Sequence, residues 1–228
     1  MNKLFIFGDS ILKGVTFSDE RRRLVIASSG GYGEIEQMGY DVKNKSRLGA
    51  TITKGLGIMD ETLEECGEGD IVLIEYGGND CDYEWQMISE DPDGDFLPHT
   101  PEAQFTKEYA FAIEKVRERG AIPILSTLVP VDAERYMKWI TRDKSYENIL
   151  KWLGDTSMLY RWQERYNRLV EAIARCFRCQ ILDVRDKFLL SHDYKSLISA
   201  DGIHPTEEGH AIIRSALSSI LRERAATV

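Results

Sequence analysis

The residues of this sequence best suited to chemistry are a serine near its start and an acid and a histidine near its end. Ser10 follows the apolar run Leu4–Phe7 after a Gly-Asp pair, so its hydroxyl should lie just beyond a buried strand. Asp201 and His204 stand three residues apart. A serine becomes a strong nucleophile when a base lies within hydrogen-bond reach and an acceptor orients that base. The three side chains therefore predict a nucleophile, its general base and an orienting carboxylate.

Two further blocks contain a glycine and an asparagine, which taken alone would be a turn glycine and a loop residue. Gly49 lies within Ser46–Ala50, and Asn79 lies within Gly77–Asp80. A glycine lets the main chain approach a substrate closely. An asparagine offers an NH₂ donor that stays neutral at every working pH.

These four blocks, in this order, resemble the motifs of the SGNH hydrolases, also called GDSL-type hydrolases. The resemblance runs from residue 8 to residue 205, and four ordered blocks are far more specific than Gly-Asp-Ser alone. An ester carbonyl under attack develops an oxyanion, which needs hydrogen-bond donors fixed in advance. The resemblance implies an oxyanion hole made of the N–H of Ser10, the N–H of Gly49 and the side-chain amide of Asn79. It also implies a covalent acyl-enzyme, with His204 moving the proton and Asp201 holding the imidazole.

Four more residues are assigned to the substrate-binding region. Asp9 and Asp80 adjoin the serine and asparagine blocks, where we expect hydrogen bonds that fix the loops. Trp85 follows the asparagine block closely, and Trp139 lies within Pro130–Asp155. Aromatic rings with a polar atom can stack on a sugar or a flat leaving group and also form hydrogen bonds.

Short apolar runs alternate with longer helical patterns, which is typical of a parallel α/β sheet covered by helices on both faces. The family resemblance implies a three-layer α/β/α sandwich around a flavodoxin-like five-stranded sheet with strand order 2-1-3-4-5. Start and stop signals predict helices over 100–120 and after 205, and apolar spacing predicts helices over 52–66 and 159–177. The predicted strands are Leu4–Phe7, Tyr40–Lys45, Asp70–Tyr76, Ala121–Val129 and Gln180–Val184.

The 228 residues fit a single hydrolase domain, 1–228, without a linker or an internal repeat. Two segments, Cys81–His99 and Pro130–Asp155, are longer than ordinary connections. Both follow the carboxyl end of a predicted strand, which is the edge where open α/β sheets bind ligands. We interpret the insertion at 130–155 as a pocket wall or lid, with plain packing or a subunit contact as the alternative.

Composition excludes several classes of function. The chain has 29 Lys and Arg against 38 Asp and Glu, a net charge of −9, which argues against nucleic acid as a partner. The basic run Arg21–Arg23 is expected in an exposed loop. No apolar stretch approaches the roughly 18 residues of a membrane span. Because Met1–Lys3 leads directly into a strand without a secretion signal, we expect a cytoplasmic protein.

The sequence indicates neither a metal site nor a cofactor. Cys176 and Cys179 form a single C-x-x-C without a second ligand pair, and the four histidines are scattered. The glycines of Gly30–Gly33 do not complete a dinucleotide-binding motif.

We therefore expect a serine esterase for small soluble carboxylic esters, from acetyl to butyryl, with an acetylated sugar as the favoured substrate. The same residues would serve an acyltransferase, a thioesterase or a carbohydrate deacetylase. The alternative from another class is a non-catalytic, flavodoxin-like module whose Ser10 loop holds a phosphate or a sugar. The expected partner is a small-molecule ester rather than nucleic acid or membrane, and a homo-oligomer is left open.

Overall fold

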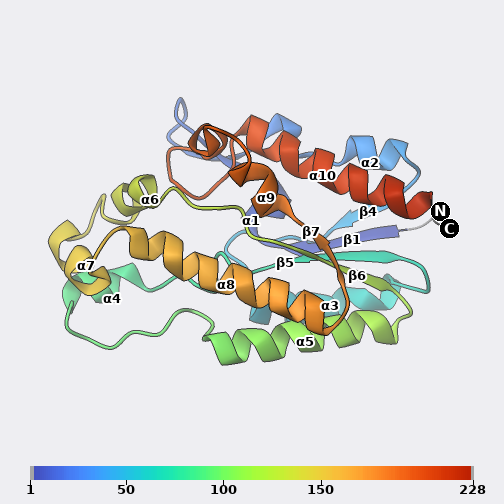
Figure 1. Ribbon diagram of the computed structural model, residues 1–228, viewed down its shortest axis with the longest axis horizontal. Helices are drawn as coiled ribbons and strands as arrows, with labels where there is room; N and C mark the ends of the chain where they lie inside the picture. The colour runs from blue at the N-terminus through green and yellow to red at the C-terminus, as the bar shows by residue number, and fades with distance from the viewer. Residues whose placement is uncertain (1–2, 227–228) are drawn as a thin grey trace.

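A parallel sheet of five strands forms the centre of the protein, whose computed structural model describes residues 3–226 (Figure 1). The spatial order of the strands is β4-β1-β5-β6-β7, which is 2-1-3-4-5 when only the sheet strands are counted. The predicted fold class and strand order are therefore confirmed. The strands are β1 (Lys3–Gly8), β4 (Asp41–Asn44), β5 (Ile71–Glu75), β6 (Ile122–Ser126) and β7 (Gln180–Leu182).

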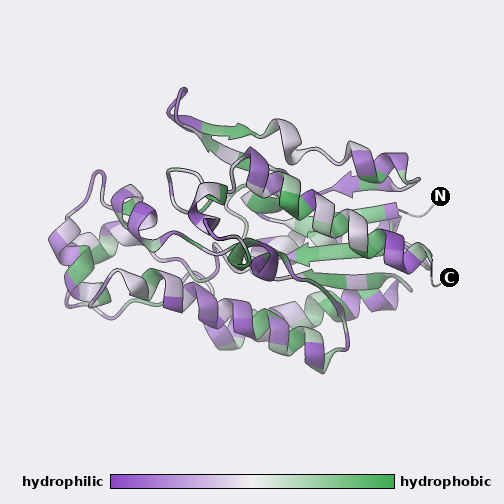
Figure 2. Ribbon diagram, turned by 45° about the horizontal axis from the view of Figure 1, so that its top comes forward, coloured by the Kyte–Doolittle hydropathy of each residue, from purple (hydrophilic) through white to green (hydrophobic). Residues whose placement is uncertain are grey.

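Helices cover both faces of the sheet because successive strand side chains point to opposite sides. On β1, Phe5 and Phe7 pack with one set of helices, and Leu4 and Ile6 pack with the other set. Figure 2 shows the strands as a hydrophobic centre between helices of mixed hydropathy. The first set is α3 (Ile52–Thr62), α5 (Glu102–Glu118) and α8 (Ser157–Cys176), and the second is α2 (Gly33–Gln37), α9 (Val184–Leu189) and α10 (Glu207–Ala225).

The fourth strand predicted from the sequence is longer than the observed strand. The strand predicted over Ala121–Val129 ends at Ser126. Beyond it, the N–H of Leu128 donates to Asn167 Oδ1 on α8 at 3.0 Å, so the chain leaves the sheet. The last helix begins as expected, because the Thr206 hydroxyl caps it by accepting the N–H of Gly209.

A β-hairpin after the first strand was not predicted. It is formed by β2 (Val15–Ser18) and β3 (Arg23–Ile26), which pair antiparallel and are separate from the main sheet. Of the basic run 21–23, the first two residues form an exposed turn and the third starts β3. The hairpin is preceded by α1 (Ser10–Lys13) and followed by the short helix η1 (Ser28–Gly30).

The two long segments fold together at one end of the sheet. They contain α4 (Trp85–Glu90), α6 (Ala133–Ile140) and α7 (Tyr146–Leu153), which share a separate hydrophobic cluster with the start of α8. Figure 1 shows this group beyond the carboxyl ends of the strands, at the left of the view. The remaining short helices are η2 (Leu63–Glu65) and η3 (Tyr194–Leu197).

Within the described residues, no helix is both long enough and apolar enough to cross a membrane. The expectation drawn from Met1–Lys3 rests partly on residues 1 and 2, which lie outside the described residues.

Candidate active site

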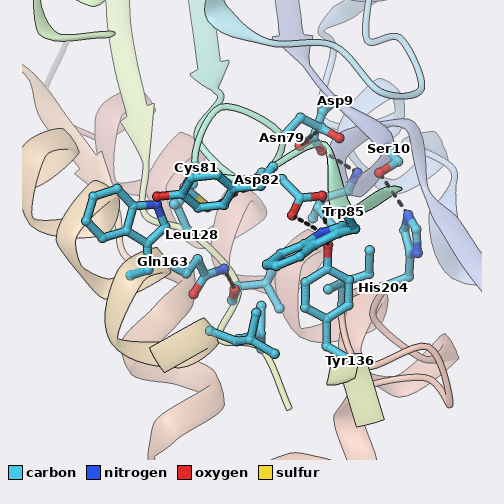
Figure 3. A pocket seen from close by; sticks show the side chains of 18 of the residues that line it. Asp9, Ser10, Asn79, Cys81, Asp82, Trp85, Leu128, Tyr136, Gln163 and His204 are labelled. Carbon is cyan, nitrogen blue, oxygen red and sulfur yellow. Dashed lines mark hydrogen bonds between the residues drawn. The ribbon is translucent and has the colours of Figure 1, made fainter. Parts of the chain in front are cut away.

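The structure brings together the serine, histidine and aspartate that the sequence singled out. Figure 3 shows the serine and the histidine of this array. Ser10 is the first residue of α1, directly after β1. Its Oγ lies 2.9 Å from His204 Nε2, and His204 Nδ1 lies 2.7 Å from Asp201 Oδ2. When the ring proton is on Nδ1, this nitrogen donates to Asp201, and Nε2 accepts the hydroxyl proton of Ser10. All three residues are buried, and the side chains of His204 and Asp201 are 7% and 0% exposed.

A tight turn before α10 holds the aspartate and the histidine in place. Asp201 Oδ1 accepts the backbone N–H groups of Ile203 and His204, both at 3.1 Å. Gly202 has a φ of +83°, and its carbonyl accepts the N–H of Asp132 at 2.8 Å. A Cβ atom at this position would lie 2.3 Å from the backbone nitrogen of Tyr136. The start of α6 therefore packs directly onto this turn, and only glycine fits there.

Two backbone N–H groups beside the serine have no hydrogen-bond acceptor in the part of the chain that the structure describes. They belong to Ser10 and Gly49. The loop of Gly49 is fixed by its neighbours, since the N–H of Arg47 donates to Gly8 O at 3.0 Å and Ala50 O accepts the Asn79 amide at 3.2 Å. Gly49 is exposed, with a φ of +65° and open space where a side chain would stand.

The Asn79 amide is oriented by two acceptors. Its Nδ2 donates to Asp9 Oδ2 at 2.8 Å and to Ala50 O at 3.2 Å. Since a carboxylate and a carbonyl only accept, the NH₂ group rather than Oδ1 must face them. His99 contacts the same residue from the main-chain side, with Nδ1 lying 3.0 Å from Asn79 O.

The acids next to these motifs are buried and fix loops. Asp9 accepts the N–H of Ile11 at 2.8 Å, and Asp80 accepts the N–H of Ile52 at 2.9 Å. Burial raises the pKa of Asp9 to about 6. Burial likewise raises the pKa of Asp80 to about 7. Asp9 borders a cavity beside Ser10, whereas Asp80 is fully buried and does not line that cavity.

A cavity of about 100 Å³ opens beside the serine and runs into the cluster formed by the long segments (Figure 3). Ser10, Asn79 and His204 line it, and Trp85 forms part of its wall as expected. Trp139 does not line it. That ring packs edge-on against Phe17, with ring centroids 5.0 Å apart, so the structure gives it no place in the cavity. The apolar part of the wall includes Leu128, Val129, Val131, Trp152, Leu153, Met158, Leu159 and Trp162.

A carboxylate that was assigned no role from the sequence organises the aromatic wall. Asp82 Oδ1 accepts the indole N–H of Trp85 at 2.8 Å, and Asp82 Oδ2 accepts the hydroxyl of Tyr136 at 2.7 Å. Burial raises the pKa of the Asp82 carboxyl, while these hydrogen bonds oppose that rise. One side chain thus joins the 81–99 and 130–155 segments at the cavity, although its position two residues after the Gly-Asn-Asp motif was the only sequence signal.

The other histidines have different surroundings. His210 is fully buried, and its Nε2 lies 2.8 Å from Val15 O at the start of the hairpin. Burial lowers the pKa of His210 to about 4, so it is neutral near pH 7 and acts as a structural residue. Among residues 3–226, no group of three His, Cys, Asp or Glu side chains has an arrangement suited to a metal ion.

A doubly wound sheet with a Ser-His-Asp array beyond its first strand defines the SGNH class of acyl hydrolases. The family model for the GDSL-like lipase/acylhydrolase family matches residues 6–212, and the chain belongs to this family. The protein is therefore an enzyme that hydrolyses ester bonds.

Solved structures share the fold at low sequence identity. The lipase/acylhydrolase from Enterococcus faecalis is 18% identical with a TM-score of 0.66, covering 98% of this chain and 97% of its own. TesA is 19% identical with a TM-score of 0.61, covering 97% and 99%. The acetyl xylan esterase AlAXEase is 18% identical with a TM-score of 0.63, covering 96% and 98%. The comparison with curated proteins finds no match.

Proposed function

We propose that the enzyme is a serine esterase that hydrolyses small soluble esters with short acyl groups through a covalent acyl-enzyme. The observation that carries the proposal is the hydrogen-bonded array of Ser10, His204 and Asp201 at the mouth of a small apolar cavity. A binding module would need neither a serine–histidine contact of 2.9 Å nor a buried carboxylate on the far ring nitrogen.

The geometry supports a two-step acyl transfer. His204 Nε2 takes the Ser10 proton while Oγ attacks the carbonyl carbon, and the carbonyl oxygen becomes an oxyanion. The N–H groups of Ser10 and Gly49 are free to bind it, and the Asn79 amide adds a third donor by releasing its longer contact to Ala50 O. When the ester C–O bond breaks, His204 returns the proton to the leaving alcohol.

Water then attacks the acyl-enzyme in the same way. His204 accepts a proton from the water as its oxygen bonds to the acyl carbon, and it protonates Ser10 Oγ as that bond breaks. The products are a carboxylic acid and the free enzyme. Throughout, Asp201 remains ionised and stabilises the imidazolium form of His204.

The size of the cavity supports short acyl groups. Its volume of about 100 Å³ is smaller than the roughly 150 Å³ of an engineered cavity that binds benzene. An acetyl or butyryl chain fits this space, whereas longer chains would overpack it. Its aliphatic side chains, such as Leu128 and Leu159, suit the hydrocarbon part of such an acyl group.

The wall also suits an acetylated sugar as the soluble substrate. Trp85 and Trp152 offer flat faces, and the Asp82 carboxylate offers hydrogen-bond acceptors. The structural similarity to an acetyl xylan esterase is consistent with this choice.

The test is a panel of p-nitrophenyl esters with acyl chains of about two to twelve carbons, whose kcat/KM should be highest at four carbons or fewer and fall steeply beyond about six. A fluorophosphonate probe should label wild-type protein in a 1:1 ratio at Ser10, and S10A should remain unlabelled. A maximum at eight carbons or longer would overturn the short-acyl assignment. Absence of Ser10 labelling would overturn the acyl-enzyme mechanism.

A further inference from the structure

The last residue of β5 is a buried acid for which the reaction steps above have no role. Glu75 is 2% exposed and lies opposite Gly8 in the parallel pairing of β5 with β1. Asp9, which follows Gly8, is equally buried. One carboxyl group thus stands at the end of β5 and another directly after β1, next to the nucleophile Ser10.

A hydrogen bond between the two carboxyl groups lowers the pKa of Asp9 and raises the pKa of Glu75. Glu75 Oε2 receives no hydrogen bond from any N–H or O–H group in residues 3–226, and no described basic side chain forms an ion pair with either acid. A Cβ on Gly8 would lie 3.1 Å from this oxygen, so the acid fills the space that the glycine leaves.

A carboxyl–carboxyl hydrogen bond requires one proton, because two ionised carboxylates can only accept. Asp9 uses its oxygens as acceptors for the N–H of Ile11 and for the Asn79 amide, which suits the ionised form. Glu75 is therefore the partner that carries the proton and donates it. Burial and the neighbouring Asp9 charge raise the pKa of Glu75 well above its usual value, in agreement with this assignment.

Asp9 connects Glu75 to the Asn79 amide. Asp9 Oδ2 is the closer of the two acceptors that set the direction of the Asn79 NH₂ group (Figure 3). We propose that Glu75 is a positioning residue for the oxyanion hole: as a neutral acid it donates to Asp9, and the carboxylate held in this way orients the Asn79 amide. The inference rests on the proposed function, because it assigns Asn79 a role in that reaction.

Two substitutions separate this role from simple packing. E75Q keeps a neutral side chain of the same length whose NH₂ group can donate to Asp9. E75M keeps the length but has no donor. In E75M we expect kcat for p-nitrophenyl acetate to fall by about 10- to 100-fold with KM nearly unchanged, since the lost alignment matters in the transition state. In E75Q the loss of kcat should stay within about threefold.

The result that overturns the inference is an equal loss of kcat in the two variants, or a loss that lies in KM alone. A second measurement covers the case in which E75M does not fold. At neutral pH, the infrared difference spectrum of wild type minus E75Q should show the carbonyl band of a protonated carboxylic acid, and its absence would equally overturn the inference. This band does not depend on ester turnover, so a failure of the proposed function remains distinguishable from a failure of the Glu75 assignment.

Discussion

Replacing Gly202 with alanine tests how the turn before α10 holds the histidine. A Cβ there would lie 2.3 Å from Tyr136 N and 2.7 Å from Asp132 O, whereas ordinary contacts of this kind begin at 3.4 Å. The turn and the start of α6 must therefore separate by about 1 Å, at an overpacking cost of about 1–3 kcal/mol. The φ of +83° adds about 1–2 kcal/mol for a residue with a Cβ. We expect G202A to lower the free energy of unfolding by about 2–5 kcal/mol.

The same displacement should reduce activity. His204 follows Gly202 by two residues, and its Nε2 must stay within hydrogen-bond distance of Ser10 Oγ, which is 2.9 Å away in the structure. A misplacement of about 1 Å in such an array costs about 10²-fold in rate. The assay is kcat/KM for p-nitrophenyl acetate, measured on samples that urea unfolding shows to be folded at the assay temperature.

Gly69 provides a matched control for G202A. Its φ of +81° is nearly the same, but no atom lies within 4 Å of the position of a Cβ. G69A should therefore lose only the backbone contribution of about 1–2 kcal/mol and keep full activity. Equal losses of stability in G202A and G69A, or full activity in a folded G202A, would refute the packing reasoning.

Three further predictions concern the motifs. S10A and H204A should each remove nearly all esterase activity, and the double variant should lose little more, because the array acts as a unit; multiplicative losses in the steady-state assay would contradict this. N79A should lower kcat by about 10²–10³ with a smaller change in KM, and a change confined to KM would instead make Asn79 a substrate-binding residue. Burial raises the pKa of Asp80 from 3.8 to about 7, so the folded state keeps a proton that the unfolded state releases between these values. The free energy of unfolding should therefore fall as pH rises through this range. Urea unfolding at about pH 5 and pH 8 should show a smaller fall in D80N than in wild type. The same fall in both proteins would show that Asp80 is not its source.

The central sheet was predictable because its three inner strands, β1, β5 and β6, are buried on both faces. Their near-continuous apolar runs leave little choice of structure, and the residues just past β1 and β5 must then meet at one edge. The hairpin was not predictable in this way. Most of β3 is exposed, and its pairing depends on tertiary contacts such as the 2.9 Å hydrogen bond between Thr16 and Ser199, which are 183 residues apart.

The site was predictable in its motifs but less so in its walls. Trp85 and Trp139 look alike in the sequence, yet one ring faces the cavity and the other faces Phe17 on the hairpin. Which way a helix turns its aromatic side chains depends on neighbours that sequence spacing does not reveal. Glu75 had a local signal, since it is an acid within a fully buried apolar run, and such residues are rare unless paired.

The contact between α6 and the turn at Gly202 has a consequence for engineering. One segment, 130–155, contributes Tyr136, Trp152 and Leu153 to the cavity and also donates the Asp132 N–H to the turn that carries His204. A loop exchange meant to widen the acyl site would therefore also disturb the proton-transfer geometry. Point substitutions on α7 avoid this coupling, because they reshape the cavity without altering the backbone that abuts Gly202. Substrate range in this enzyme should thus be easier to change from α7 than by replacing the whole insertion.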